Sequence, residues 1–177
     1  MTGPAPNPIL NLAELPLLPR PPEWAPPPET AQRIAMHSGR IGSPLGLTHL
    51  GCSLVAVAPG KQAFPFHSHR HNDELFVVLA GSGELRLGGN RHPLRAGDVV
   101  DCLAGGPETA HAITNTGPTG LRHLATSSQH STEICDCPDS GKTGWFDARP
   151  TSVRDTPPQT EHVLARDGQV VDDWDGE

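Results

Sequence analysis

The chain has 177 residues, which is typical of a single domain, and its formal net charge of −7 argues against nucleic acid and anionic membrane surfaces as partners. The first Lys or Arg is Arg20, and the longest apolar run is far too short to span a bilayer, so we expect neither an export signal nor a membrane anchor. Four cysteines are too few for a secreted disulfide scaffold, which predicts a cytoplasmic protein with reduced thiols.

The first part of the chain, residues 1–40, is predicted to be a proline-rich N-terminal arm. Ten of the 20 prolines precede Glu29, and repeated proline disfavours both helices and sheet interiors. Two interpretations stay open: an extended leader, or an arm that docks on a partner subunit through its leucines and Trp24. The segment 29–37 fits a short helix or an outer strand equally well.

The stretch 60–81 contains the first group of candidate ligands. A strand is predicted for 47–58, and a Pro-Gly turn separates it from this stretch. His67 and His69 are two residues apart, so on a strand their imidazoles would point to the same face. Glu74 can join them only if the chain bends within 70–73, where the polar Asn-Asp sequence suits a turn. The next strand is then expected over 74–80.

Short predicted strands follow at regular intervals. Gly88-Gly89-Asn90 is expected to close a hairpin, and further strands are expected over 99–103, 109–115 and 121–127. A turn signal about every ten residues predicts an antiparallel sandwich or barrel. His111, in the segment 109–115, is the candidate for a fourth ligand beside His67, His69 and Glu74.

These residues resemble the cupin superfamily. The first motif of that family, His-x-His, four residues, Glu, six residues and Gly, is matched by His67, His69, Glu74 and Gly81. The second motif is matched at Gly97, Gly105, His111 and Asn115, with Leu103 in place of a proline and His111 three residues late. The resemblance implies an all-β, single-domain, cupin-like β-barrel (jelly roll) over residues 41–130. It also implies a metal site inside the barrel, formed by His67, His69, Glu74 and His111.

Three imidazoles and one carboxylate suit Zn, Fe, Mn, Ni or Cu better than Ca or Mg, and we expect one such divalent metal per chain. Four protein ligands leave two positions of an octahedral shell for water, oxygen or a small molecule. We therefore expect a metal-dependent enzyme acting on a small oxygen-rich molecule, with oxygenase, isomerase and lyase chemistry left open. The alternative is a non-catalytic small-ligand binding or sensor protein with the same pocket. Its opening is expected to be lined by Phe64, Phe66, Phe76 and Ile113.

Other polar residues and the cysteines are further candidates for the site. His71 is expected in the bend, at the rim and not on the metal. Arg86 and Arg122 fit a solvated face, or alternatively a cationic lining for an anionic substrate. Cys135 and Cys137 are expected to be ordinary loop cysteines, because their spacing does not match structural zinc sites. Cys52 and Cys102 are expected to be small buried hydrophobes.

The last part of the chain, residues 131–177, is predicted to be a C-terminal extension that is mostly loop, an irregular tail on the barrel. Assembly is predicted from the strand over 74–80, which is apolar on both faces. One small barrel has a single interior, so the outer face with Leu75, Val77 and Leu79 must be covered by the arm or by a second subunit. We expect a homodimer.

Overall fold

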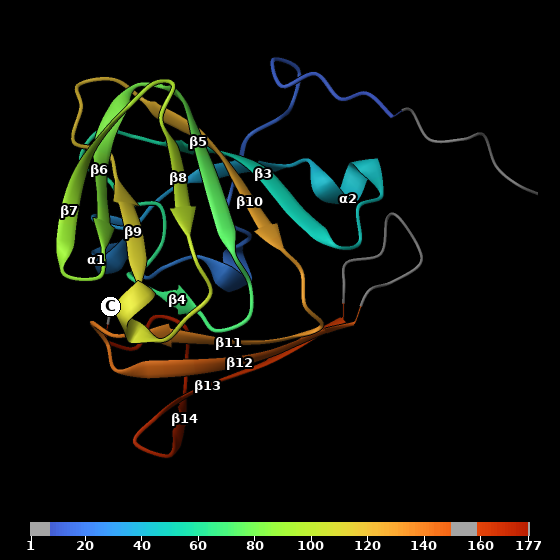
Figure 1. Ribbon diagram of the computed structural model, residues 1–177. Coiled ribbons are helices and arrows are strands. Elements are labelled where there is room, and N and C mark those ends of the chain that lie inside the picture. Colours follow the sequence, from blue (N-terminus) through green and yellow to red (C-terminus); the bar gives the residue numbers. More distant parts are fainter. Residues whose placement is uncertain (1–7, 150–158, 177) are drawn as a thin grey trace, which may run out of the picture.

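The computed structural model describes residues 8–149 and 159–176, and these form three antiparallel sheets joined by short turns (Figure 1). The predicted all-β fold is confirmed. The sheets are not one continuously hydrogen-bonded cylinder, and isolated bridges pair residues outside the named strands with β9, including one between His67 and His111. No helix among the described residues is long and apolar enough to cross a membrane.

The largest sheet has six strands in the order β1-β2-β3-β10-β5-β8. Its members are β1 (Leu18–Pro19), β2 (His37–Arg40), β3 (Leu50–Val57), β10 (Leu121–Ser128), β5 (Glu74–Ala80) and β8 (Val99–Cys102). The central strands β3, β10 and β5 are the ones expected over 47–58, 121–127 and 74–80. In β5, Phe76 and Val78 are buried whereas Leu75 and Leu79 are exposed, as the period of two in a strand requires.

A second sheet has three strands in the order β7-β6-β9, namely β6 (Ser82–Leu87), β7 (Asn90–Arg95) and β9 (His111–Thr114). The expected hairpin is confirmed: β6 and β7 pair from Leu87 opposite Asn90, and Gly88 takes the positive φ of 53° that this tight turn uses. The main hydrophobic core packs between this sheet and the six-stranded sheet. It consists of Val55, Val57, Ala63, Phe76, Val78, Leu85, Leu94, Val100, Cys102, Ile113 and Leu121.

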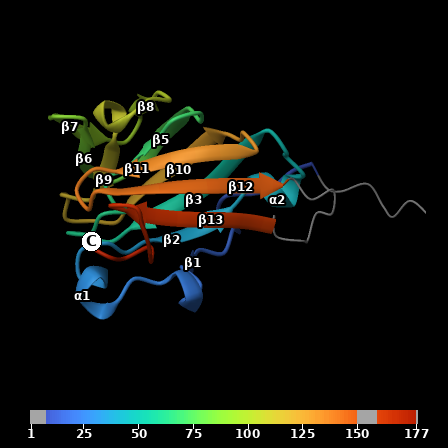
Figure 2. The same ribbon diagram turned by 90° about the horizontal axis from the view of Figure 1, so that it is seen from below.

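The C-terminal extension is not the loop that we predicted. It forms β11 (Thr132–Cys137), β12 (Lys142–Arg149), β13 (Gln159–Arg166) and β14 (Gln169–Val171), which build a sheet in the order β14-β13-β12-β11-β4. Figure 2 shows β11, β12 and β13 lying side by side across one end of the molecule. The sequence pattern failed here because polar residues such as Glu133, Asp136 and Lys142 take buried positions, so apolar alternation is missing.

The edge strand of this C-terminal sheet is β4 (Ser68–His69), which carries one of the candidate ligands. Ser68 pairs with Asp136 and His69 with Cys135. The extension therefore fixes the backbone at the predicted site directly, although its own sequence lies more than 60 residues further along the chain.

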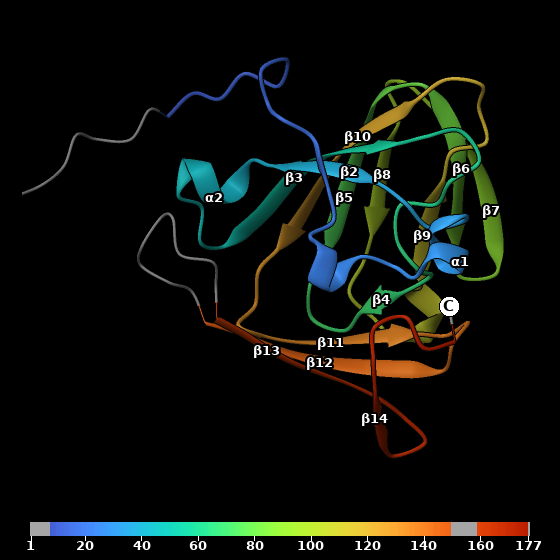
Figure 3. The same cartoon turned by 180° about the vertical axis from the view of Figure 1, so that it is seen from behind.

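The described part of the N-terminal arm packs on its own chain. It contains β1, the 3-10 helix η1 (Pro22–Trp24) and the short helix α1 (Pro28–Ala31), and it runs along the outside of the molecule next to β2 (Figure 3). The side chain of Leu15 lies so close to Gly39 that any Cβ there would clash. The ambiguous segment 29–37 contains the end of α1 and the start of β2, separated by a turn. Residues 1–7 of the arm lie outside the described residues. A further short helix, α2 (Gly42–Leu45), precedes β3, and the 3-10 helix η2 (Pro107–Thr109) precedes β9.

Candidate metal centre

Backbone pairing brings the two most distant predicted ligands together. His67 and His111 form an isolated antiparallel bridge, in which the His67 N–H donates to the His111 carbonyl at 3.1 Å and the His111 N–H donates to the His67 carbonyl at 2.7 Å. Their ring centroids are 4.8 Å apart. His111 is the first residue of β9, so its position follows from the pairing of β9 with β6.

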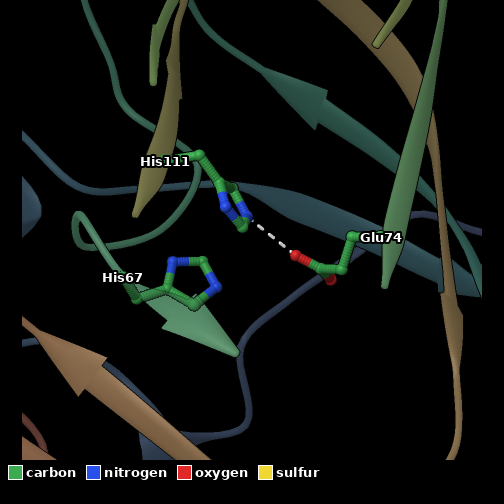
Figure 4. Close-up of side chains that lie close together, drawn as sticks. All are labelled: His67, Glu74 and His111. Carbon is green, nitrogen blue, oxygen red and sulfur yellow. Dashed lines mark hydrogen bonds and ion pairs between the residues drawn. The ribbon is translucent and has the colours of Figure 1, made fainter. Parts of the chain in front are cut away.

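His67, Glu74 and His111 form a compact group from three separate segments (Figure 4). One nitrogen or oxygen atom from each residue lies within 4.8 Å of the others. The closest pair is His111 Nε2 and Glu74 Oε2, at 2.8 Å. Metal–ligand bonds of about 2.1 Å place neighbouring ligand atoms roughly 3 Å apart at a right angle, so this spacing fits a shared ion. The mixed nitrogen and oxygen donors also fit a divalent transition metal.

The outer nitrogens of these imidazoles have acceptors of their own. His67 Nδ1 lies 2.9 Å from the Pro65 carbonyl oxygen, and His111 Nδ1 lies 3.5 Å from the Thr109 carbonyl oxygen. A proton on each Nδ1 leaves Nε2 free to face a metal, whereas without a metal His111 Nε2 carries the proton and donates it to Glu74 Oε2. Metal-binding histidines are commonly oriented in this way by a backbone carbonyl.

Burial and charge favour the protonation states that a metal ligand needs. Burial lowers the pKa of His67 to about 3, with a smaller contribution from the neighbouring histidines His111 and His69, so the imidazole is neutral at pH 7. Burial alone would raise the pKa of Glu74. The hydrogen bond from His111 and the charges of the three histidines overcome this, and the pKa of Glu74 is about 2. Neutral imidazoles and an ionised carboxylate are the forms that bind a metal.

His69 lies at the edge of this group and outside its tight set of three. Its Nε2 is 3.6 Å from Glu74 Oε2, and its ring centroid is 5.0 Å from that of His67. Its Nδ1 lies 3.1 Å from the Cys135 Sγ. His71, which the sequence placed in the bend, has a side chain that is 52% exposed, and its Nδ1 lies 3.6 Å from Glu133 Oε1.

The predicted bend between His69 and Glu74 is present, and Glu133 of β11 holds it. The Glu133 carboxylate accepts hydrogen bonds from the backbone N–H of His71 at 3.0 Å and from that of Asn72 at 2.7 Å. Asp73 stabilises the other end of the bend, because its Oδ1 accepts a hydrogen bond from the Ala104 N–H at 2.8 Å. Sequence reasoning missed Glu133, since an acidic residue on a remote segment without apolar alternation gives no signal of such contact.

His67 and Glu74 line a cavity of about 620 Å³ between the six-stranded sheet and the C-terminal sheet, and His111 lies buried behind them. This volume is in the usual range for small-molecule sites. Phe64 and Phe76 line it, as expected, together with His67, His69 and Glu74. Phe66 and Ile113 do not line it: both are buried, Ile113 in the main core and Phe66 beside Ala110 and Ala112. The cavity wall also includes residues from both ends of the chain, among them Arg20 and Trp174.

The two arginines proposed from the sequence lie elsewhere. Arg86 donates to both carboxylate oxygens of Asp139, at 2.6 and 2.9 Å, and its guanidinium carbon is 3.5 Å from the Phe66 ring centroid. Arg122 is half-buried on β10, and its Nε has no partner among the described residues. Neither residue lines the cavity.

The cysteines differ from expectation in two respects. Cys135 and Cys137 are not loop residues, because both lie on β11 and both line the cavity. Cys102 is a buried small residue, as expected, whereas Cys52 is half-buried. All four are free thiols. Burial raises the pKa of Cys102 to about 12 and raises the pKa of Cys135 further, so both thiols stay protonated at pH 7.

Comparisons with known proteins agree with this geometry. Residues 53–126 match the sequence model of the cupin domain. The oxalate-binding protein of Thermotoga maritima is 36% identical over 67 residues, which cover 38% of this chain and 53% of that protein. The match thus spans about half the length of this curated relative.

Two solved structures resemble the chain over most of its length. A sugar phosphate isomerase of the cupin superfamily from Silicibacter pomeroyi has a TM-score of 0.72 and 23% identity, over 90% of this chain and 93% of that one. A protein from Acidithiobacillus ferrooxidans, proposed to be a sugar phosphate isomerase, has a TM-score of 0.62 and 26% identity, over 78% of this chain and 82% of that one.

Proposed function

The chain is a cupin-type protein, and from this premise we propose that it is a metal-dependent enzyme acting on a small oxygen-rich molecule. One divalent transition metal, Zn, Fe, Mn, Ni or Cu, is bound by His67, His69, Glu74 and His111. The observation that carries the proposal is the convergence of His67, Glu74 and His111, of which His67 and Glu74 line a cavity large enough for a substrate. When bound, such a metal supplies a Lewis acid for an oxygen ligand.

The protein's own residues have distinct tasks in this proposal. His67 and His111 present Nε2, because carbonyl oxygens of Pro65 and Thr109 lie beside their other nitrogens. His69 joins the ligand set by a small turn of its ring, since its Nε2 is 3.6 Å from Glu74 Oε2. Phe64 and Phe76 form an apolar wall that excludes water from the ligand.

The substrate class is supported by the relatives. One relative is named for oxalate and two structural neighbours for sugar phosphates, and both are small molecules rich in oxygen. The reaction class within oxygenase, isomerase and lyase chemistry is not part of the proposal, because one fold carries all three.

The experiment is to load the purified protein with each metal and to incubate it with oxalate and a panel of sugar phosphates, followed by proton and carbon NMR. We expect conversion of at least one compound by the metal-loaded protein and none after chelation. Failure to bind any of these metals, or conversion that is equally fast without metal, would overturn the proposal.

A second candidate function is a non-catalytic small-ligand binding or sensor protein. The specific observation in its favour is the relative named for oxalate binding, which is 36% identical over 67 residues. Tight binding of a compound to the metal-loaded protein, with no conversion of any member of the panel, would favour this candidate.

We also propose that the protein is a homodimer in the cytoplasm. On the outer face of β5 and β8, Leu75, Leu79 and Val99 are 43%, 41% and 64% exposed. The described arm packs against Gly39 on β2 and leaves the outer face of β5 and β8 exposed. A strand that is apolar on both faces is buried on both faces, so a second subunit is expected to pack on this one. Four free cysteines support a reducing compartment.

A further inference from the structure

Arg20 enters the cavity wall from the N-terminal arm, immediately after β1. The pairing of β1 with β2 fixes the backbone that delivers it. Its guanidinium carbon lies 4.6 Å from the ring centroid of Phe64 and 5.5 Å from that of Trp174. Two aromatic rings from distant parts of the chain therefore hold this cation through its charge, without using its N–H donors.

The donors of Arg20 have no acceptor within the described part of the protein. No oxygen atom there receives a hydrogen bond from its guanidinium. Burial lowers the pKa of Arg20, and the charge of Asp173 acts in the opposite direction. By contrast, Arg70 and Arg86 each donate two hydrogen bonds to an aspartate. Arg20 is half-buried, so its unused donors remain available to a ligand or to water in the cavity.

This arginine belongs to the same cavity as the candidate metal centre. Arg20, His67 and Glu74 all line it, and Phe64 is a neighbour of both Arg20 and His67. The Phe64 ring centroid is 4.6 Å from the guanidinium carbon of Arg20 and 6.1 Å from the His67 ring centroid. The guanidinium carbon and the His67 ring are therefore at most about 11 Å apart. A small molecule can therefore touch both ends at once. Arg40 also lines the cavity but is exposed, which places it at the rim.

We propose that Arg20 binds the anionic end, a carboxylate or a phosphate, of the molecule whose other oxygens reach the metal centre. The inference rests on the proposed function for the metal end of the ligand and adds the recognition of its charged end. The planar guanidinium offers paired donors that match both kinds of anion. The ligand is thus anionic although the protein carries a net charge of −7.

The test compares ligands that differ only by a charged group. Lactate and malate differ mainly by a second carboxylate, and dihydroxyacetone and dihydroxyacetone phosphate differ by a phosphate. Affinities are measured by calorimetry on the cobalt-loaded and the metal-free full-length protein, and the visible cobalt spectrum is recorded in parallel. The variants are Arg20→Gln, Arg20→Lys and Arg95→Gln. Arg95 is an exposed arginine on β7 outside the cavity, so Arg95→Gln is the matched control for loss of one charge.

In wild type and Arg95→Gln, we expect at least one charged probe to bind about 10- to 100-fold more tightly than its partner. The pair that shows this preference identifies the anion as carboxylate or phosphate. In Arg20→Gln the preference is expected to vanish while cobalt content is unchanged. Arg20→Lys keeps a cation over the rings but loses the paired donors, so an intermediate preference is expected, and this variant decides the matter if Arg20→Gln does not fold.

Two results would overturn the inference: no preference for either charged probe in wild type, or a full preference that survives in the Arg20 variants. Failure of the metal proposal looks different. In that case cobalt does not bind, or no probe changes its spectrum, while an Arg20-dependent preference persists in the metal-free protein. A purely structural Arg20, which only joins the arm to Trp174, would change the melting temperature and leave the ratio of affinities unaltered.

Discussion

Glu133 is expected to be the residue of the C-terminal extension on which the metal centre most depends. Its side chain is 7% exposed, and its carboxylate accepts from the backbone N–H groups of His71 and Asn72 and from that of Ile134. Glu133→Gln replaces one carboxylate oxygen by an NH₂ group, which then faces a backbone donor. Hydrogen bonds to charged groups contribute about 1.5–3 kcal/mol each. The NH₂ group loses least at the Oε2 position, where only the Asn72 N–H donates, so the change should cost at least about 1.5–3 kcal/mol of unfolding free energy.

The same change should weaken metal binding, because the bend that directs Glu74 towards the histidines is loosened. Loss of an outer partner of a metal site typically costs about 10- to 100-fold in affinity. Unfolding in guanidinium chloride gives the stability, and competition with a chromophoric chelator gives the metal affinity. Glu84→Gln is the matched control, because Glu84 pairs with the well-exposed Arg91 and should change stability by less than about 1 kcal/mol. Indistinguishable stability and metal affinity in the two variants would refute the reasoning.

Three further predictions concern His69, the exposed face of β5 and the pair of Arg70 with Asp136. His69→Ala should lower metal affinity by about 10-fold or more. His71→Ala should leave the amount of metal per chain, measured by mass spectrometry, nearly unchanged, and equal losses of metal in the two variants would show that the bend lies elsewhere. Leu79→Asp should raise the dimer dissociation constant by roughly 100-fold in sedimentation equilibrium, since a charge replaces a leucine on the proposed contact face; an unchanged constant would remove that face from the interface. The hydrogen bonds from Arg70 hold the pKa of Asp136 below its usual value, so their stabilisation requires the ionised carboxylate. The stability difference between wild type and Arg70→Met should therefore be full above about pH 4 and shrink as the pH falls further, and a difference that is constant with pH would contradict this.

The part of the site that could be predicted from the sequence is the part with a local signal. His67 and His69 share a face because a strand has a period of two, and Glu74 joins them only through a bend, which the structure contains. The sequence also predicts a strand around His111. The distance from His111 to the other candidate ligands depends on its backbone bridge with His67, which has no local signal.

The rest depended on contacts that no local pattern records. Glu133 and Cys135 reach the site because β11 pairs with β4, and buried polar residues on β11 hide the strand pattern. Arg20 reaches the cavity through the pairing of a two-residue strand. Arg86 was a reasonable candidate for the cavity, but Asp139 and Phe66 hold it outside.

The position of a bound metal ion in a crystal structure tests the proposed metal centre most directly. Crystals of the protein grown with cobalt, with diffraction recorded at the cobalt absorption edge, should show one strong anomalous peak per chain. We predict this peak about 2.0–2.2 Å from nitrogen atoms of His67, His69 and His111 and from an oxygen of Glu74. A peak at Cys135 and Cys137 instead, or no peak in the cavity at saturating cobalt, would contradict the account.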